Sequence, residues 1–202
     1  HRALTAKIAA RYNVVGVVVD KKEKLKTAGG FATVLKKIIN KIRFGKIDAA
    51  WSQLQEHYTQ QYPAWPERPV LFTGSINSKE SFEFTTQLKP DLIIVSGTSL
   101  IREPMLSMPL PVGIMNLHTG LSPYVKGGPN CTNWCIANNQ RHMAGNTIMW
   151  LSAGIDNGNI ITSEKISIEN EKSLPAIHLK VMEHAHDLYL RAVQYVMNTR
   201  PP

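Results

Sequence analysis

The stretch Gly113–Ile161 decides the fold of this chain and carries its most distinctive polar residues. It begins GIMNLHTGLSPYVKGGPNCTNWCIANN and ends NTIMWLSAGIDNGNII. An apolar run ends in Asn116 and His118, and Asp156 lies in a turn bounded by glycines. Because side chains alternate along an extended segment, Asn116 and His118 are expected on the same face of a strand. A carboxylate arriving from the later turn can then complete an acid–base site.

Apolar runs typical of buried strands alternate with helical segments on both sides of this stretch. Strands are predicted at Val14–Val19, Val70–Thr73, Leu92–Ser96, Val112–Leu117, Thr147–Leu151 and Ile160–Ile168. Helices are predicted at Leu4–Tyr12, in the basic region after Asp20, and at Ala49–Tyr58, Lys79–Leu88, Pro129–Asn138 and Leu174–Met197. The alternation predicts an α/β fold that is doubly wound, with a mainly parallel sheet flanked by helices.

The length of 202 residues favours one domain over residues 1–202, with residues 174–202 as a closing helix and tail. A doubly wound domain normally opens with a strand that feeds its first helix. This chain opens inside a predicted helix, at His1-Arg2-Ala3-Leu4. We therefore expect that the first strand of the sheet is missing from the chain.

Composition narrows the class of protein and its environment. Hydrophobic residues make up 43% and charged residues 19%, which is ordinary for a soluble globular protein. No apolar run is long enough for stable membrane insertion, and no secretory signal precedes the first elements. Cys131 and Cys135 are too few for a disulfide framework and are expected to be small buried residues, whereas Trp134 and Trp150 are expected in the core. This cysteine usage fits a reducing environment, so we expect a cytoplasmic protein. We expect no metal, since no further Cys or His has suitable spacing.

The net charge of +8 is concentrated in the segment Lys21–Lys46, which holds nine Lys and Arg residues against the single acid Glu23. Apolar residues recur there at spacings of three and four, which predicts an amphipathic helix with a basic outer face. A solvated outer face is the favoured interpretation. The alternatives are a surface for a phosphate-rich partner, such as RNA or a nucleotide-linked substrate, and a surface for an anionic membrane.

The polar residues of the opening stretch suit acyl transfer to an amine. An Asn amide can donate to a developing oxyanion, a His can donate to it or move a proton, and a carboxylate can orient the His. No covalent nucleophile is needed if the amine attacks directly. The chain has no G-x-S-x-G, P-loop or G-x-G-x-x-G pattern, which disfavours covalent catalysis and dinucleotide binding.

Topology predicts where a ligand binds. In open α/β sheets, ligands lie beyond the carboxyl ends of the strands. Asn116 and His118 occupy one such end, and the segment Gly97–Ile101 follows another. Both are therefore expected to line one crevice.

Two motifs in these segments resemble those of a known family. Asn116-Leu117-His118, followed by Gly120-Leu121-Ser122-Pro123-Tyr124-Val125-Lys126-Gly127-Gly128, resembles the Asn-x-His…Leu-x-Pro-x-Tyr-x-Gly signature of the folate-dependent formyltransferases. Gly154-Ile155-Asp156-Asn157-Gly158-Asn159-Ile160-Ile161 resembles their Gly-x-Asp-x-Gly-x-Ile turn. That family includes glycinamide ribonucleotide, methionyl-tRNA and sugar N-formyltransferases.

The resemblance implies a formyltransferase-like catalytic domain that uses 10-formyltetrahydrofolate as co-substrate, a primary amine on a small molecule as acceptor, and no metal. By resemblance, Asn116 and His118 polarise the formyl carbonyl, and Asp156 holds the His or relays the amine proton. The loop that receives the pterin ring through backbone groups corresponds to Gly97, Thr98, Ser99, Leu100 and Ile101. The other wall of the pterin site corresponds to Leu151, Ser152, Ala153, Gly154 and Ile155.

The acceptor is the least specified part of the resemblance. Met149 stands seven positions before Asp156, where the purine-pathway enzymes are expected to carry a His, and this favours the tRNA and sugar branches. The sequence ends before a C-terminal barrel domain such as that of methionyl-tRNA formyltransferase. A nucleotide-linked amino sugar is therefore the leading acceptor, with methionyl-tRNA and glycinamide ribonucleotide as alternatives. A non-catalytic folate-binding or interaction protein is the alternative of another class, and the apolar closing helix is compatible with a homodimer.

Overall fold

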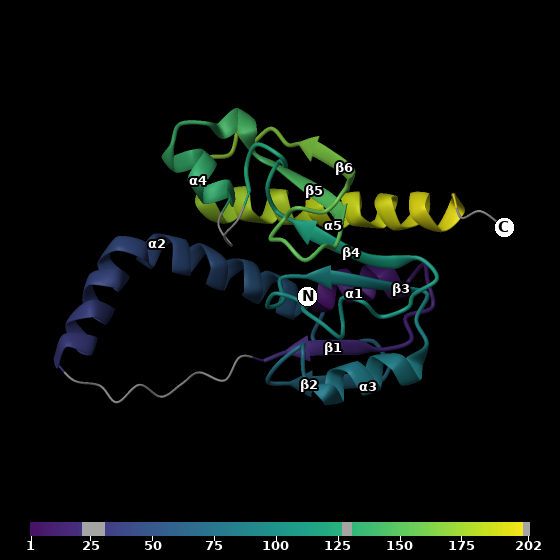
Figure 1. Cartoon of the computed structure of the whole chain (residues 1–202). Helices are drawn as coiled ribbons and strands as arrows, with labels where there is room; N and C mark the ends of the chain where they lie inside the picture. Colours follow the sequence, from purple (N-terminus) through teal and green to yellow (C-terminus); the bar gives the residue numbers. More distant parts are fainter. Residues whose placement is uncertain (22–30, 127–130, 200–202) are drawn as a thin grey trace.

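The computed structural model describes residues 1–21, 31–126 and 131–199, with the backbone alone described for residues 31–38 and 40–43. Its helices are α1 (Arg2–Ala9), α2 (Phe31–Gln61), α3 (Lys79–Leu88), α4 (Cys131–Ala137) and α5 (Leu174–Asn198), with a 3-10 turn at Arg141–Met143. Its strands are β1 (Val17–Asp20), β2 (Val70–Thr73), β3 (Leu92–Ser96), β4 (Gly113–His118), β5 (Gly145–Trp150) and β6 (Ile160–Lys165), arranged as in Figure 1.

Local signals account for the elements that match their predicted bounds. The bounds of β2, β3 and α3 are those predicted. The hydroxyl of Ser78 accepts the Ser81 N–H at the start of α3, and Lys89 adopts a left-handed conformation (φ 46°) where the helix ends. Pro90 follows at once, and a residue before proline is disfavoured in a helix.

The prediction of two helices between Asp20 and Tyr62 is wrong, because α2 runs without a break from Phe31 to Gln61. Gly45 lies inside it, yet an interior glycine costs only about 1 kcal/mol relative to alanine and no proline interrupts the segment. Much of the predicted basic face falls on residues 22–30 and on side chains outside the described part of the chain.

The strands form a two-stranded sheet, β1-β2, and a four-stranded sheet in the order β3-β4-β5-β6. Two pairings, β1 with β2 and β3 with β4, are parallel, as the α/β class requires. The pairings of β4 with β5 and of β5 with β6 are antiparallel, so the parallel character stops at β4. Residues 151–159 connect β5 to β6, and they are too few for a parallel crossover, which takes a dozen or more residues.

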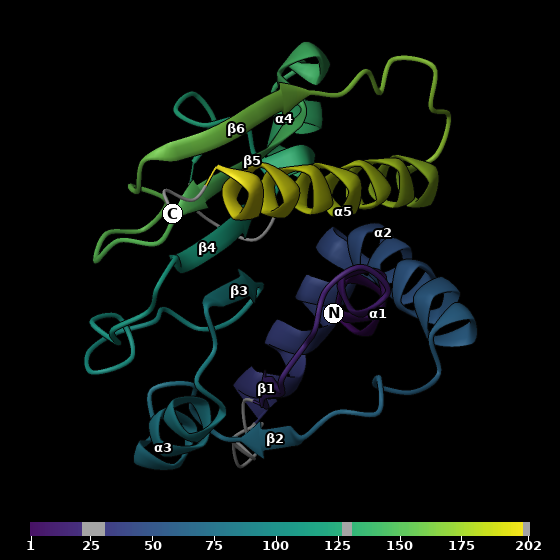
Figure 2. The same ribbon diagram turned by 90° about the vertical axis from the view of Figure 1, so that its right-hand side faces the viewer.

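The two sheets lie side by side, with β1 next to β3 in both views (Figures 1 and 2). Within the described residues no ladder joins β1 to β3. The α/β class with flanking helices is confirmed, whereas the expectation of a missing first strand stays a prediction.

Helices cover both faces of the strands, and β4 separates two apolar clusters. Helices α1, α2 and α5 lie on one face and α3 lies on the other (Figure 2). Met115 and Leu117 of β4 pack toward α1 and α5, in a cluster that includes Leu4, Leu188 and Tyr189. Ile114 packs on the opposite face, with Val95, Ile101, Met105 and Met108. The predicted closing helix is α5, and its buried Tyr189 hydroxyl donates to the Met115 carbonyl at 2.7 Å.

A partly buried polar cluster joins α1, α2 and α5. Lys7 pairs with Glu183 at 2.7 Å, and the Tyr58 hydroxyl donates to the same carboxylate at 2.6 Å. His186 lies beside them, with its Nδ1 3.5 Å from Lys7 Nζ and its ring centroid 5.4 Å from that of Tyr58. Burial, followed by the positive charge of Lys7, lowers the pKa of His186 to about 4. The folded protein therefore holds this imidazole neutral.

This cluster should make stability depend on pH. The unfolded chain takes up the His186 proton near pH 6.5, whereas the folded chain does so only near pH 4. Above pH 6.5 His186 is neutral in both states and does not change the free energy of unfolding. As pH falls from 6.5 toward 4, only the unfolded chain takes up this proton, so the free energy of unfolding decreases by up to about 3 kcal/mol. Urea unfolding between pH 7.5 and pH 4.5 should show this slope, and His186→Gln should flatten it. The exposed His142 gives the control, since His142→Gln should keep the wild-type slope; identical slopes in all three proteins would contradict the prediction.

Candidate active site

Asn116 and His118 lie on the face of β4 that points away from α5. They alternate with Met115 and Leu117, and they share the side of Ile114. The Asn116 amide is half-buried and makes no hydrogen bond to the residues that the structure describes. It is therefore available to a ligand at the carboxyl end of the strand.

The structure brings Asp156 to His118, although they lie on different elements. Asp156 Oδ2 is 3.2 Å from His118 Nδ1, with the two side chains 13% and 6% exposed. Asp156 sits in the turn between β5 and β6 in a left-handed conformation (φ 46°). Aspartate tolerates that conformation better than most residues, so the turn can present the carboxylate without a glycine at this position.

The other ring nitrogen of His118 is held by the backbone. His118 Nε2 lies 2.8 Å from the Val125 carbonyl oxygen. A carbonyl oxygen only accepts, so Nε2 carries the hydrogen in this contact. Nδ1 is left to face the Asp156 carboxylate. The Val125 contact was not predicted, because a backbone carbonyl leaves no mark in the side-chain pattern.

The segment after His118 is fixed by Thr147, which pairs with His118 across the antiparallel ladder. The Thr147 hydroxyl donates to the Gly120 carbonyl at 2.7 Å and accepts the Ser122 N–H at 3.0 Å. Gly120 packs closely on the site, since an added Cβ would lie 2.3 Å from His118 Nε2 and 2.7 Å from the Val125 oxygen. Met149 pairs with Asn116 in the same ladder and is fully buried.

The two segments predicted to wall the pterin site, Gly97–Ile101 and Leu151–Ile155, each contribute a residue to the same apolar region. Ile101 is buried in the cluster around Ile114, and Leu151 packs against that cluster. The Leu151 N–H donates to the Ile114 carbonyl at 2.8 Å, which ties the second wall to β4. Gly97 turns the first wall away from β3 with φ 64°. Ala153, Gly154 and Ile155 are exposed beside Asp156.

Some polar groups in and beside these two segments already make hydrogen bonds within the chain, and others do not. The Ser99 N–H donates to Asp20 Oδ2 at 3.0 Å, and the Leu100 carbonyl accepts from Asn77 at 2.9 Å. Ser152 Oγ and Asp20 Oδ1 are buried without a partner within the described chain. Buried polar atoms are normally satisfied, so these two are candidates for contacts with a ligand. A polar heterocycle between the apolar walls fits this donor and acceptor set.

In the part of the chain that the structure describes, the side chains around His118 form neither a metal-binding cluster nor a reactive thiol. Within the described residues no cluster of three or more His, Cys, Asp or Glu side chains has the arrangement of a metal site. Cys131 and Cys135 are buried as predicted. Burial, followed by the charge of Asp156, raises the pKa of the Cys131 thiol to about 11, so it is neutral near pH 7 and a poor nucleophile. The prediction of a buried Trp134 is wrong: it is 63% exposed, because it lies on the outer side of the short helix α4.

Comparison with known proteins agrees with this geometry. A family model described as "Formyl transferase" matches residues 13–193. The chain therefore belongs to the formyl transferase family. It is 30% identical over 118 residues to the methionyl-tRNA formyltransferase of Clostridium tetani, covering 58% of this chain and 37% of that protein. It is also 30% identical over 135 residues to that of Syntrophus aciditrophicus, covering 66% and 42%. The chain thus spans about two fifths of these curated relatives.

Solved structures share the fold. The chain matches phosphoribosylglycinamide formyltransferase from Bacillus halodurans with a TM-score of 0.63 and 21% identity, covering 98% of this chain and 89% of that one. It matches the formyltransferase PseJ from Anoxybacillus kamchatkensis, in complex with UDP-4,6-dideoxy-4-formamido-L-AltNAc and tetrahydrofolate, with a TM-score of 0.53 and 16% identity, covering 90% and 76%.

Among the described residues, no helix is long and apolar enough to cross a membrane.

Gly120 provides a test of the packing around His118. In Gly120→Ala the added methyl group meets the ring and the Val125 carbonyl, and the backbone partner has little freedom to move. We expect a loss of about 1–3 kcal/mol in the free energy of unfolding, which is typical of overpacking. Gly74→Ala is the matched control, because nothing lies within 4 Å of its added Cβ. Chemical denaturation measures both, and equal stability of the two variants would show that the contact is absent.

Proposed function

We propose that this protein transfers a formyl group from 10-formyltetrahydrofolate to a primary amine. The observation that carries the proposal is the pairing of His118 with Asp156 at 3.2 Å, beside the Asn116 amide at the carboxyl end of β4. Membership of the formyl transferase family supports it.

Each residue of the site has a defined task in this proposal. The co-substrate supplies the formyl group. The Asn116 amide donates a hydrogen bond to the formyl oxygen as negative charge develops there, a contribution that is large in a site closed to water. His118 holds the Asp156 carboxylate through Nδ1, while its Nε2 stays bonded to the Val125 carbonyl. Asp156 orients its imidazole and takes up, directly or through it, the proton that the attacking amine loses. The amine attacks the formyl carbon directly. The bond from that carbon to the co-substrate nitrogen then breaks, and tetrahydrofolate leaves with the proton that the amine gave up.

The co-substrate is proposed to lie between the Gly97–Ile101 loop and the Leu151–Ile155 segment. Ile101 and Leu151 offer apolar surface to its ring system. Ser152 Oγ and Asp20 Oδ1, buried without a partner in the described chain, are proposed to exchange hydrogen bonds with its polar edge.

A nucleotide-linked amino sugar is the proposed acceptor. Met149 supports it, since this apolar residue faces Asn116 across the ladder where a His was expected for the purine-pathway enzymes. The fold shared with PseJ, whose complex holds a UDP-linked formamido sugar, is compatible with it. A cytoplasmic location and a homodimer are kept as expectations from the sequence.

Methionyl-tRNA is the second candidate acceptor, favoured by a separate observation. The curated relatives at 30% identity are methionyl-tRNA formyltransferases. The positive charge in Lys21–Lys46 is a further argument, since Lys and Arg bind the phosphates of RNA.

Substitution of the three site residues tests the proposed chemistry. Asn116→Ala, His118→Ala and Asp156→Asn should each lower the rate of formyl transfer by about 10²–10⁴-fold, the range expected for loss of an oxyanion donor or a proton carrier. Asn keeps the left-handed turn at position 156, so that variant changes charge and little else. Asn138→Ala and His142→Ala, both exposed, are the matched controls. Full activity in the Asn116 and His118 variants would overturn the assignment of these residues, whereas no formyl transfer by the wild type to any acceptor would favour a non-catalytic folate-binding protein.

The acceptor is identified by comparing three candidates in separate assays. The protein is given 10-formyltetrahydrofolate with a UDP-linked amino sugar, glycinamide ribonucleotide or methionyl-tRNA, and the formylated product is measured. The amino sugar should be formylated fastest, with a rate that changes little with salt. If tRNA is the acceptor, binding should weaken by at least about tenfold between about 50 and 200 mM salt, because phosphate contacts release counterions.

A further inference from the structure

Cys131 touches the proposed catalytic histidine from a side that the mechanism does not use. Its Sγ lies 3.8 Å from His118 Nε2, and the residue is only 2% exposed at the start of α4. The same nitrogen is bonded to the Val125 carbonyl and is closely approached by Gly120. The Nε2 edge of the ring is therefore enclosed by the chain.

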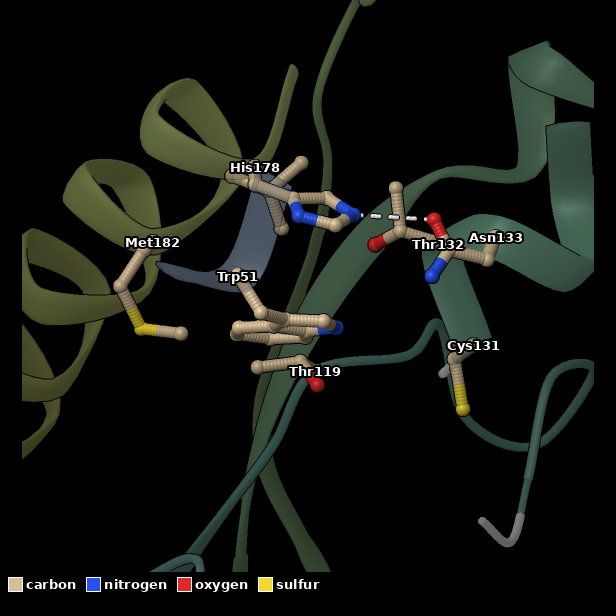
Figure 3. Close-up of a pocket in the computed structure, with 8 residues that line it drawn as sticks. Trp51, Thr119, Cys131, Thr132, Asn133, His178 and Met182 are labelled. Atoms are coloured by element: carbon tan, nitrogen blue, oxygen red, sulfur yellow. Dashed lines mark hydrogen bonds between the residues drawn. The ribbon is translucent and has the colours of Figure 1, made fainter. Parts of the chain in front are cut away.

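A cavity lies on the other side of Cys131. It has a volume of about 20 Å³ and is lined by Cys131 and Thr119, by Trp51 of α2, and by His178 and Met182 of α5 (Figure 3). Space of this size holds about one water molecule. His118 does not line it, whereas Cys131 lines it and also touches His118. Cys131 therefore contacts both the His118 ring and the cavity, and it separates one from the other.

The cavity has a mainly apolar lining, but it also holds polar groups that would compete for the His118 ring if Cys131 were removed. His178 Nε2 is bonded to Asn133 Oδ1 at 2.9 Å, but His178 Nδ1 is buried without a partner in the described chain. Thr119 and Thr132 add hydroxyl groups. A water molecule there, or a rotated His118 ring, would find partners other than Val125.

The chemistry of a thiol suits this position. Sulfur is a weak hydrogen-bond donor and acceptor, so it does not draw the Nε2 hydrogen away from the Val125 carbonyl. The thiol is neutral, so it adds no charge next to Asp156. A hydroxyl at the same place would compete with Val125, and a methyl group would leave a gap that joins the cavity.

We propose that Cys131 is a positioning residue: its thiol walls off the Trp51–His178 cavity and holds the His118 ring with Nε2 on Val125 and Nδ1 on Asp156. The inference rests on the proposed formyl transfer for its catalytic meaning, although the contact itself does not. Cys131 acts through His118 and does not touch the substrate.

The experiment compares Cys131→Ala, Cys131→Val and Cys135→Ala. Cys135 is the matched control, because it is equally buried and lies one turn further along α4. Cys131→Ala should lower kcat about tenfold, since small displacements of a catalytic group are costly, with KM for 10-formyltetrahydrofolate within about twofold. Cys131→Val refills the space without a polar group and should recover most of kcat. Cys135→Ala should match the wild type.

A second readout follows the ring itself and needs no activity. In protein labelled with ¹⁵N-histidine, the His118 ring signals, identified by their loss in His118→Ala, should move in Cys131→Ala and stay in place in Cys135→Ala. If the wild type formylates no acceptor while these signals move, the proposed function fails and the positioning role stands. If the signals are unchanged in Cys131→Ala, or if Cys135→Ala lowers kcat as much, the inference is overturned.

Discussion

The alternation of side chains along β4 is the constraint on which the rest of the structure depends. One set of residues, Met115 and Leu117, is buried against α1 and α5 and anchors the strand. The other set carries Ile114, Asn116 and His118 to the opposite face. Burial of a large apolar side chain contributes about 1.5–3 kcal/mol, so a slip of one residue in register would cost the core and remove the site together. Stability and the placement of the polar pair are therefore secured by the same strand.

The site is built by bringing three separate segments to one imidazole. The β5–β6 turn supplies the Asp156 carboxylate to Nδ1, the segment after β4 supplies the Val125 carbonyl to Nε2, and α4 supplies the Cys131 thiol. These contacts are largely buried, so competition with water is weak and electrostatic interactions are stronger than at the surface. An imidazole held at both nitrogens has little freedom to tilt, so it keeps the Asp156 carboxylate in a fixed geometry.

Much of the fold was predictable because its signals are local. The apolar runs at Val70–Thr73 and Leu92–Ser96, and the stop imposed by Pro90, define elements without reference to distant residues. The predictions that were wrong concern effects the local pattern does not carry. A single glycine did not divide α2, and Trp134 lies on the exposed side of a helix too short to show a clear apolar face. The antiparallel pairing after β4 depends on the path of the connections in three dimensions.

By itself the sequence determined the α/β class, the shared face of Asn116 and His118, and the presence of Asp156 in a glycine-bounded turn. These follow from periodicity and from residue type, which act over a few neighbouring positions. Only the tertiary structure decided that Asp156 reaches Nδ1, that the Val125 carbonyl holds Nε2, and that Cys131 separates the ring from a cavity. Those contacts join residues from distant segments. They depend on backbone atoms and on packing, and these two factors leave no periodic pattern in the sequence.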